Sequence, residues 1–228
     1  MIMQTTKVSI NNKIDANFIK IIPILYHKKR LMETRNRGIY RKVRLLRLWM
    51  FFVIMKVMKS YNTLNDYYRK LFGEKTFKVP IDAGFDCPNR DGTVAHGGCT
   101  FCTVSGSGDA IVAPDAPIRE QFYKEIDFMH RKWPDVQKYL VYFQNFTNTH
   151  EKVEVIRERY EQAINEPGVV GINIGTRPDC LPDETIEYLA ELSERMHVTV
   201  EFGLQTTYET TSDLINRAHS YELYVETV

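Results

Sequence analysis

The sequence has 228 residues, of which 43% are hydrophobic and 26% are charged, and a chain of this length can bury the core of one or two domains. Its four cysteines are too few for a disulfide scaffold. Thiols in this number are more typical of metal or catalytic sites in a reducing compartment, so we expect a cytoplasmic protein. The formal net charge of +1 excludes a chain that is basic or acidic throughout.

The first quarter of the chain differs in charge from the rest. Residues 1–59 hold 14 of the 30 Lys and Arg residues and 2 of the 29 Asp and Glu residues, which leaves 16 and 27 for residues 60–228. The apolar run 48–55 is far shorter than the roughly 20 residues that cross a bilayer, so we expect no integral membrane span. A basic arm of this kind could contact nucleic acid or an anionic membrane surface. We expect residues 1–59 to be a basic N-terminal extension, either disordered or an artefact upstream of a start at Met58.

From Tyr61 onward, strand-like and helix-like patterns alternate. The predicted strands are 76–85, 139–146, 169–175 and 198–205. The predicted helices cover 118–133 and 153–164, a third helix begins at Pro182, and a fourth begins near Thr211. The third helix is expected to carry Ile186, Leu189, Ala190 and Ser193.

Short connections between alternating strands and helices predict right-handed β-α-β units and a parallel sheet. Four such units are half of a barrel of eight, as in TIM barrels. The predicted fold class is therefore α/β, a partial (β/α) barrel formed by residues 60–228 and truncated after its fourth unit.

Three cysteines lie in a glycine-rich loop directly after the first predicted strand. Eleven residues separate Cys87 from Cys99, and two separate Cys99 from Cys102. Thiolates are soft ligands that bind iron–sulfur clusters or zinc. Glycines can adopt the positive φ angles that a loop wrapped round a cluster requires. The loop contains three at suitable places: Gly92, Gly97 and Gly98.

The number of thiolates leaves two kinds of metal centre open. A structural zinc site takes four ligands, and Cys180 or His96 could supply the fourth. A 4Fe–4S cluster held by three thiolates instead keeps one iron free to bind another molecule.

The cysteine loop resembles that of the radical S-adenosylmethionine (SAM) superfamily, whose members carry three cysteines after the first barrel strand. The usual spacing there is C-x3-C-x2-C, so the long first gap departs from it. The form CPNRDGT…GGCTFC is nevertheless that of the bacterial subfamily called the YtqA/YhcC type, which is related to the Elongator radical subunit and coproporphyrinogen dehydrogenase. Further similar stretches follow in order within residues 61–228: YFQNFTNT (142–149), GTRPDCLP (175–182), EFGLQTT (201–207) and INRAH (215–219).

The resemblance implies a 4Fe–4S cluster on Cys87, Cys99 and Cys102. Such a cluster cleaves SAM reductively to a 5′-deoxyadenosyl radical, with an electron from a reductant such as flavodoxin or ferredoxin. The implied cofactor-binding residues are Phe101 beside the adenine, and Glu201 and Gln205 beside the ribose and methionine parts. Arg177 and Asp179 follow the third strand, where they could bind the cofactor carboxylate or the substrate, or form a surface salt bridge. Many superfamily members hold the methionine amino group with a Gly-Gly-Glu stretch, which is absent here; Gln144, Thr147 and Asn148 occupy its place.

The resemblance of the TRPD and EFGLQT stretches to the Elongator subunit implies a tRNA base as substrate. RNA binding needs basic surface and stacking aromatics, and residues 67–70 (YYRK) form one candidate patch. Two other hypotheses remain open from the sequence. One is a radical SAM enzyme that acts on a small metabolite. The other is a non-catalytic fragment that binds an iron–sulfur cluster or zinc.

Overall fold

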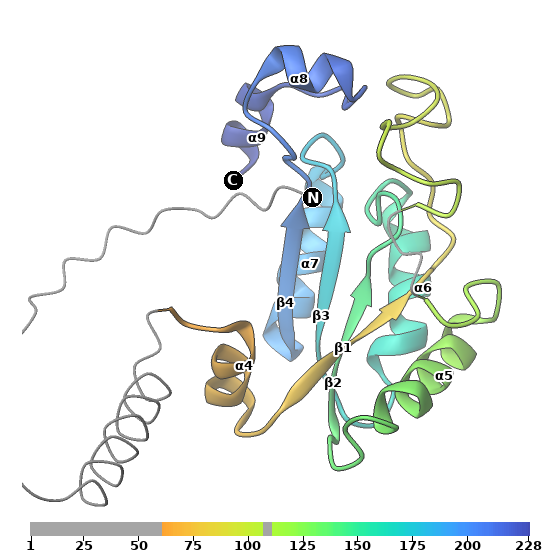
Figure 1. Ribbon diagram of the computed structural model, residues 1–228, viewed down its shortest axis with the longest axis vertical. Helices are drawn as coiled ribbons and strands as arrows, with labels where there is room; N and C mark the ends of the chain where they lie inside the picture. Colours follow the sequence, from red (N-terminus) through yellow and green to blue (C-terminus); the bar gives the residue numbers. More distant parts are fainter. Residues whose placement is uncertain (1–60, 107–110) are drawn as a thin grey trace, which may run out of the picture. The chain divides into compact units, whose positions relative to one another are not determined.

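The computed structural model describes residues 61–106 and 111–228 (Figure 1). The predicted basic extension, residues 1–59, lies outside the described residues. Residues 62–228 belong to one unit. Within the described ranges, every helix is too short or too polar to cross a lipid bilayer.

Helices and strands alternate along the described chain. Their bounds are α4 (Leu64–Phe72), β1 (Thr76–Ile81), α5 (Ile118–His130), β2 (Lys138–Phe143), α6 (Val153–Ile164), β3 (Val169–Thr176), α7 (Asp183–Arg195), β4 (His197–Phe202), α8 (Glu209–Leu214) and α9 (Tyr221–Thr227).

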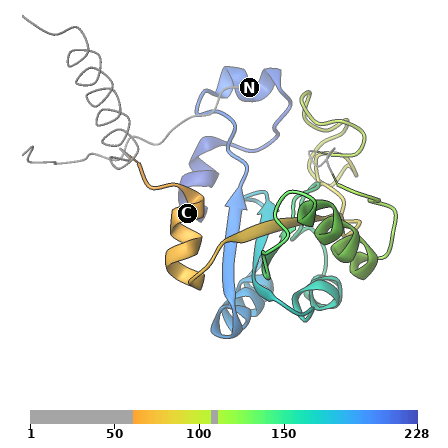
Figure 2. The same cartoon turned by 60° about the horizontal axis from the view of Figure 1, so that its bottom comes forward.

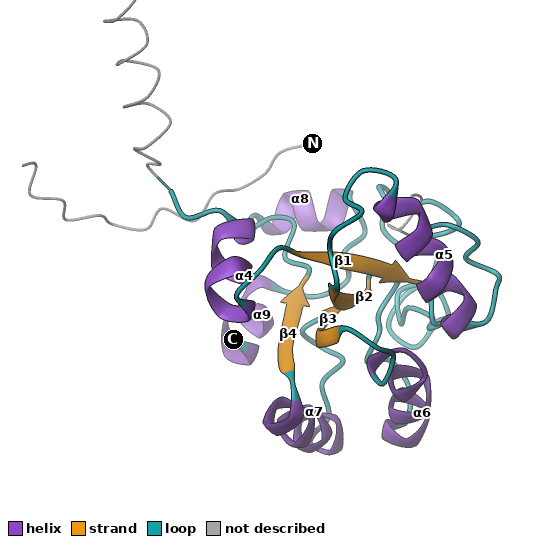
Figure 3. Cartoon of the chain, turned by 90° about the horizontal axis from the view of Figure 1, so that it is seen from below, coloured by secondary structure: helices purple, strands orange, loops and turns teal. Residues whose placement is uncertain are grey.

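The four strands form one parallel sheet in the order β1-β2-β3-β4. Seen from below, the strands follow an arc with α5, α6 and α7 on one side and α4 on the other (Figure 3). A parallel sheet that is curved, covered by its crossover helices and still open is part of a (β/α) barrel. The predicted fold class is confirmed.

The core lies between the sheet and helices α5, α6 and α7. Alternate residues of each strand point into it because successive side chains of a strand face opposite ways. The fully buried members include Val79, Ile81, Val141, Phe143, Ile172, Ile174, Phe122, Ile156, Tyr160 and Leu192. The opposite sheet face carries polar side chains, one of which comes from each strand: Lys78, Tyr142, Asn173 and Glu201.

Three strands end earlier than the sequence predicts. The strands predicted to reach Phe85, Phe146 and Gln205 end at Ile81, Phe143 and Phe202. Phe146 and Gln205 have φ angles of 59° and 58°, which no strand accommodates. Each of these strands therefore gives way to a loop at its carboxyl end, where ligand sites of such folds are built.

The four residues expected on the third helix all lie in α7, but of these only Leu189 is buried. In α7 the buried residues are Thr185, Tyr188, Leu189 and Leu192, and Ile186 is 49% exposed. The side of α7 that carries Tyr188 faces the core, where the centroid of the Tyr188 ring lies 6.3 Å from that of the Tyr160 ring.

Helix α4 was absent from the predicted elements, although its end signals are present. Thr63 caps the first turn by accepting a hydrogen bond from the Asp66 N–H, and Gly73 ends the helix with a φ of 82°. Figure 2 shows α4 beside β4 and β1. Tyr68 is buried in this position, so the candidate RNA patch at residues 67–70 is not a continuous surface.

Candidate functional site

A cavity of about 300 Å³ lies at the carboxyl ends of the strands. The cysteine loop forms one wall, and the loops after β2, β3 and β4 form the others. All three loop cysteines line the cavity, as do Phe101, Arg177, Glu201 and Gln205. The structure thus brings the three loop cysteines together with these four residues, whereas His96 and Cys180, the possible fourth zinc ligands, do not line the cavity.

Glycines shape the cysteine loop as the sequence predicts. Gly92, Gly97 and Gly98 have φ angles of 90°, 84° and 72°, which residues with a Cβ rarely adopt. A tight turn links the last two cysteines, because the Cys102 N–H donates to the Cys99 carbonyl at 3.0 Å. The prediction of positive φ angles in this loop is confirmed.

The three loop thiols are free and half-buried, whereas Cys180 is buried. Cys102 donates a hydrogen bond to Cys99, which lowers the pKa of Cys99 to about 6 and raises that of Cys102. Burial raises the pKa of Cys180 to about 12. Within the described residues, no three Cys, His, Asp or Glu side chains lie close enough to hold a single metal ion.

The segment after α8 holds the cysteine loop in place. The Thr100 N–H donates to the Ile215 carbonyl at 3.0 Å. The Asn216 side-chain amide donates to the carbonyls of His96 and Gly98, at 3.1 and 2.8 Å. These contacts join residues more than a hundred positions apart in the chain, so the first β/α unit and the last are locked at the cavity.

Glu201 accepts hydrogen bonds from side chains of three strands. Lys78 Nζ lies 2.5 Å from Oε1, Asn173 Nδ2 lies 3.0 Å from the same oxygen, and the Tyr142 hydroxyl lies 3.0 Å from Oε2. Burial would raise the pKa of Glu201, but the hydrogen bond and charge of Lys78 outweigh it and lower the pKa. An ionised carboxylate has about four acceptor positions, so about one is left for a ligand.

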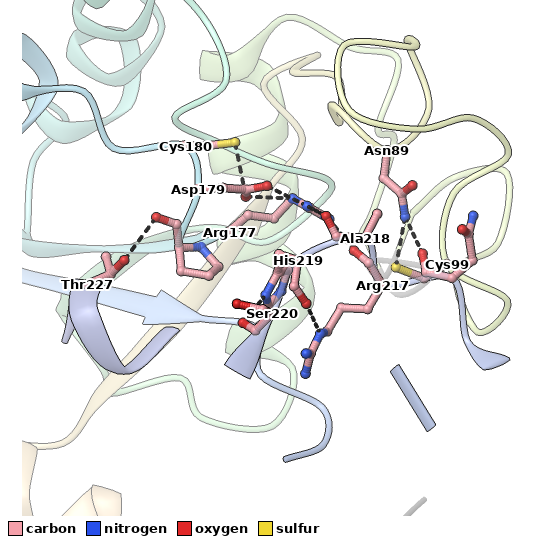
Figure 4. A network of polar contacts seen from close by, with 12 residues as sticks. Asn89, Cys99, Arg177, Asp179, Cys180, Arg217, Ala218, His219, Ser220 and Thr227 are labelled. Atoms are coloured by element: carbon pink, nitrogen blue, oxygen red, sulfur yellow. Dashed lines mark hydrogen bonds and ion pairs between the residues drawn. The ribbon is translucent and has the colours of Figure 1, made fainter. Parts of the chain in front are cut away.

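Arg177 is buried and bound on several sides (Figure 4). Its Nε and Nη2 grip both carboxylate oxygens of Asp179, at 2.8 and 2.6 Å. Nη1 and Nη2 also donate to the carbonyls of Arg217 and Ala218. Four of the five N–H groups of the guanidinium are therefore used by the protein.

Arg217 is a second buried guanidinium at the cavity, and no role for it was predicted from the sequence. It is 1% exposed and donates to the backbone carbonyls of His219, Leu204 and Thr206. Its Nη2 lies 3.5 Å from Glu209 Oε1 but makes no hydrogen bond among the described residues. Part of this buried guanidinium thus lacks a hydrogen bond, although Glu209 lies near enough to balance its charge.

Comparison with known proteins agrees with this geometry. A sequence profile of the radical SAM superfamily matches residues 90–228, which is more than half of the chain. The chain belongs to the radical SAM superfamily. The profile match includes Cys99 and Cys102 and begins after Cys87.

Relatives of the predicted type are also found. YtqA of Bacillus subtilis is 57% identical over 170 residues, which cover 75% of this chain and 52% of that protein. YhcC of Escherichia coli is 37% identical over 174 residues, which cover 76% and 55%. An uncharacterised protein of Methanocaldococcus jannaschii is 33% identical over 156 residues, which cover 67% and 47%. The chain thus spans about half the length of these relatives, and the predicted resemblance is confirmed.

The donor set at the cavity suits the cluster that radical SAM proteins use. Three soft thiols from one loop face a cavity, and the nearby side chains supply hydrogen bonds and positive charge for sulfur and carboxylate groups. The site differs from that of many superfamily members in single side chains. Asn148, one of the residues in place of the Gly-Gly-Glu stretch, instead ties β2 to β3 by donating to the carbonyls of Phe143 and Gly175.

Several cavity residues were not predicted. Tyr142, Arg217 and His219 line the cavity, and Asn89 and Asn216 brace the loop around it. The sequence carried a signal for the last segment, since INRAH stood out as a stretch shared with the subfamily. Nothing in its composition indicated which of its side chains would face the cysteines.

Proposed function

We propose that the chain is a radical SAM enzyme that holds a 4Fe–4S cluster on Cys87, Cys99 and Cys102 and binds SAM in the adjoining cavity. The observation that carries the proposal is the convergence of these thiols with Phe101, Arg177, Glu201 and Gln205 on one cavity. When bound, the cluster supplies the electron that breaks the bond between the SAM sulfur and its adenosyl carbon, and the resulting 5′-deoxyadenosyl radical abstracts hydrogen from the substrate.

The two buried arginines would bind the anionic end of SAM. Arg217 has an Nη2 without a hydrogen bond, and Arg177 has one N–H left, so together they can receive a carboxylate. Each arginine has an acidic neighbour, but Arg217 is the stronger candidate because its Nη2 lies 3.5 Å from Glu209, whereas Arg177 lies 2.6 Å from Asp179.

The apolar and neutral parts of the site would bind the nucleoside. The Phe101 ring is half-exposed and lines the cavity, so an adenine can stack on it. Glu201 has about one acceptor position left, which suits one ribose hydroxyl. Gln205 is exposed at the cavity rim and its amide is held only by neighbouring backbone carbonyls, so it can turn to a ligand.

A base of tRNA is the proposed substrate, supported by the resemblance of residues 176–179 and 201–206 to the Elongator radical subunit. A one-electron donor such as flavodoxin or ferredoxin would reduce the cluster, and both this donor and an oxygen-sensitive cluster suit the cytoplasm. A profile of modified nucleosides in tRNA from a deletion strain tests the substrate. Loss of one modification supports it, and an unchanged profile contradicts it.

The catalytic claim is tested with the full chain reconstituted anaerobically with iron and sulfide. We expect absorption near 400 nm and, with dithionite and SAM, formation of 5′-deoxyadenosine. Cys99→Ala should abolish the product, and Cys180→Ala should retain it because that thiol lies outside the ligand set. Iron loading without any 5′-deoxyadenosine would refute the enzyme proposal.

A further inference from the structure

Asn89 places its side-chain amide between the cysteine loop and the segment after α8. The residue is 0% exposed. Its Nδ2 lies 3.5 Å from Cys99 Sγ, as Figure 4 shows, and 2.5 Å from the Asn216 carbonyl oxygen. An amide nitrogen carries two hydrogens, so one is donated to the carbonyl and the other to the sulfur.

The orientation of this amide is fixed by its surroundings. A flipped amide would set its oxygen against the Asn216 carbonyl and the sulfur, which are both acceptors. The Asn216 carbonyl is itself held by the backbone, since that residue has a φ of 54° and its N–H donates to the Asp213 carbonyl at 3.0 Å. The N–H of Asn89 is therefore aimed at Cys99.

The other end of the amide shows what this orientation costs. Asn89 Oδ1 is buried and has no hydrogen-bond partner among the described residues. A buried acceptor without a partner is unfavourable and is rare in folded proteins. The two N–H groups of the Asn89 amide explain why an asparagine is suited to this position despite the unpaired oxygen. A carboxylate or an apolar side chain here would donate no hydrogen bond to the Cys99 sulfur.

We propose that Asn89 is a positioning residue that acts through Cys99 and raises the reduction potential of the cluster. The inference rests on the proposed function, because it requires Cys99 to be a cluster ligand. Reduction adds an electron to the cluster and its thiolates, and an N–H that points at a ligand sulfur stabilises that added negative charge. Asn89 thereby makes the one-electron reduction that precedes SAM cleavage easier.

Replacement of Asn89 tests the proposal by a potential rather than by activity. In Asn89→Ala the N–H is lost, and we expect about a tenfold lower ratio of reduced to oxidised cluster at a fixed potential, which is about 59 mV for one electron. Asn89→Asp keeps the shape but sets an anion near the sulfur, so its potential should be lower still. Redox titration of the reconstituted full chain, followed by electron paramagnetic resonance, measures both.

Asn216→Gly is the matched control. Glycine keeps the positive φ and the backbone carbonyl at this position but removes the side-chain donors to His96 and Gly98. It loosens the same loop and leaves the Asn89 amide facing Cys99. We expect its potential to stay close to that of the wild type when iron and sulfide contents are equal.

Each other outcome overturns the inference, and one of them also overturns the proposed function. An unchanged potential in a fully loaded Asn89→Ala protein refutes the inference and leaves the proposed function standing. An equal shift in Asn216→Gly assigns the effect to loop position and also refutes it. Failure of both Asn89 variants to load a cluster shows a role in loop folding alone and refutes it too. A wild type that binds no cluster would overturn both proposals.

Discussion

Lys78 and Glu201 form a half-buried ion pair on the polar face of the sheet, which is the face opposite the core. Their side chains are 25% and 36% exposed. The Lys78 ammonium also lies 4.1 Å from the centre of the Tyr142 ring. We expect a coupling free energy of about 1 kcal/mol between Lys78→Met and Glu201→Gln in a double-mutant cycle, at the upper end for ion pairs that water still reaches. Urea denaturation of the four proteins measures it.

The more exposed pair Arg157–Glu191 serves as the reference for that cycle. Its coupling should be smaller, because both side chains are better solvated. Equal coupling free energies in the two pairs would show that partial burial does not strengthen the Lys78–Glu201 pair.

His219 should make the stability of the apoprotein depend on pH. Burial and the charges of Arg177 and Arg217 lower its pKa, despite the opposite effects of the hydrogen bond with the Ser220 carbonyl and of Asp179. An unfolded histidine takes up its proton near pH 6.5, whereas the folded one does so only at lower pH. The unfolded state therefore binds more protons in this window, and the free energy of unfolding should fall as the pH is lowered from 7.5 to 5.5.

Urea denaturation at pH 7.5, 6.5 and 5.5 checks the size of that fall. In His219→Asn the dependence should be weaker than in the wild type. His96→Asn is the control, because His96 is exposed. A wild-type slope in His219→Asn would show that this residue is not responsible.

At the scale of elements, Tyr160 links helix α6 to the loop after β2. Its ring stacks on Phe143 with centroids 4.6 Å apart, and its buried hydroxyl donates to the Asn148 carbonyl at 2.7 Å. Tyr160→Phe leaves that carbonyl unpaired, so we expect a loss of about 1–3 kcal/mol in the free energy of unfolding. Tyr208→Phe, at a position 67% exposed, should change it little. The same small change in both variants would contradict the account.

The order and type of most elements followed from the sequence because their signals are local. Pro117 and Pro182 mark the starts of α5 and α7, and short apolar runs mark the strands. The face of α7 did not follow, because Thr185 and Tyr188 look amphipathic in sequence and become core only by packing. Strand ends were misplaced where the chain turns into cavity loops.

The residues of the candidate site were likewise predictable only where their signals are local in the sequence. The thiols and loop glycines were predictable because they are neighbours in sequence and their chemistry is distinctive. The contact between Asn89 and Asn216 depends on tertiary packing across 127 positions, and no periodicity reports it. Arg217 was missed for the same reason, since its role depends on a buried Nη2 rather than on residue type.

At the scale of the whole molecule, the described sheet has four strands, and β4 pairs only with β3 within the described ranges. The relatives are about twice as long as the part that this chain matches. The cysteine loop is nevertheless complete and is braced by the segment after α8, so cluster binding can be tested on this chain alone.

Iron and acid-labile sulfide, measured after anaerobic reconstitution of the full chain, test that claim most directly. We predict about four of each per wild-type and Cys180→Ala chain, and a large loss in each of Cys87→Ala, Cys99→Ala and Cys102→Ala. The Cys87 variant is the most informative of the three, because the superfamily profile match begins after Cys87 and therefore does not itself support this ligand. Full iron content in all three loop variants would contradict the account.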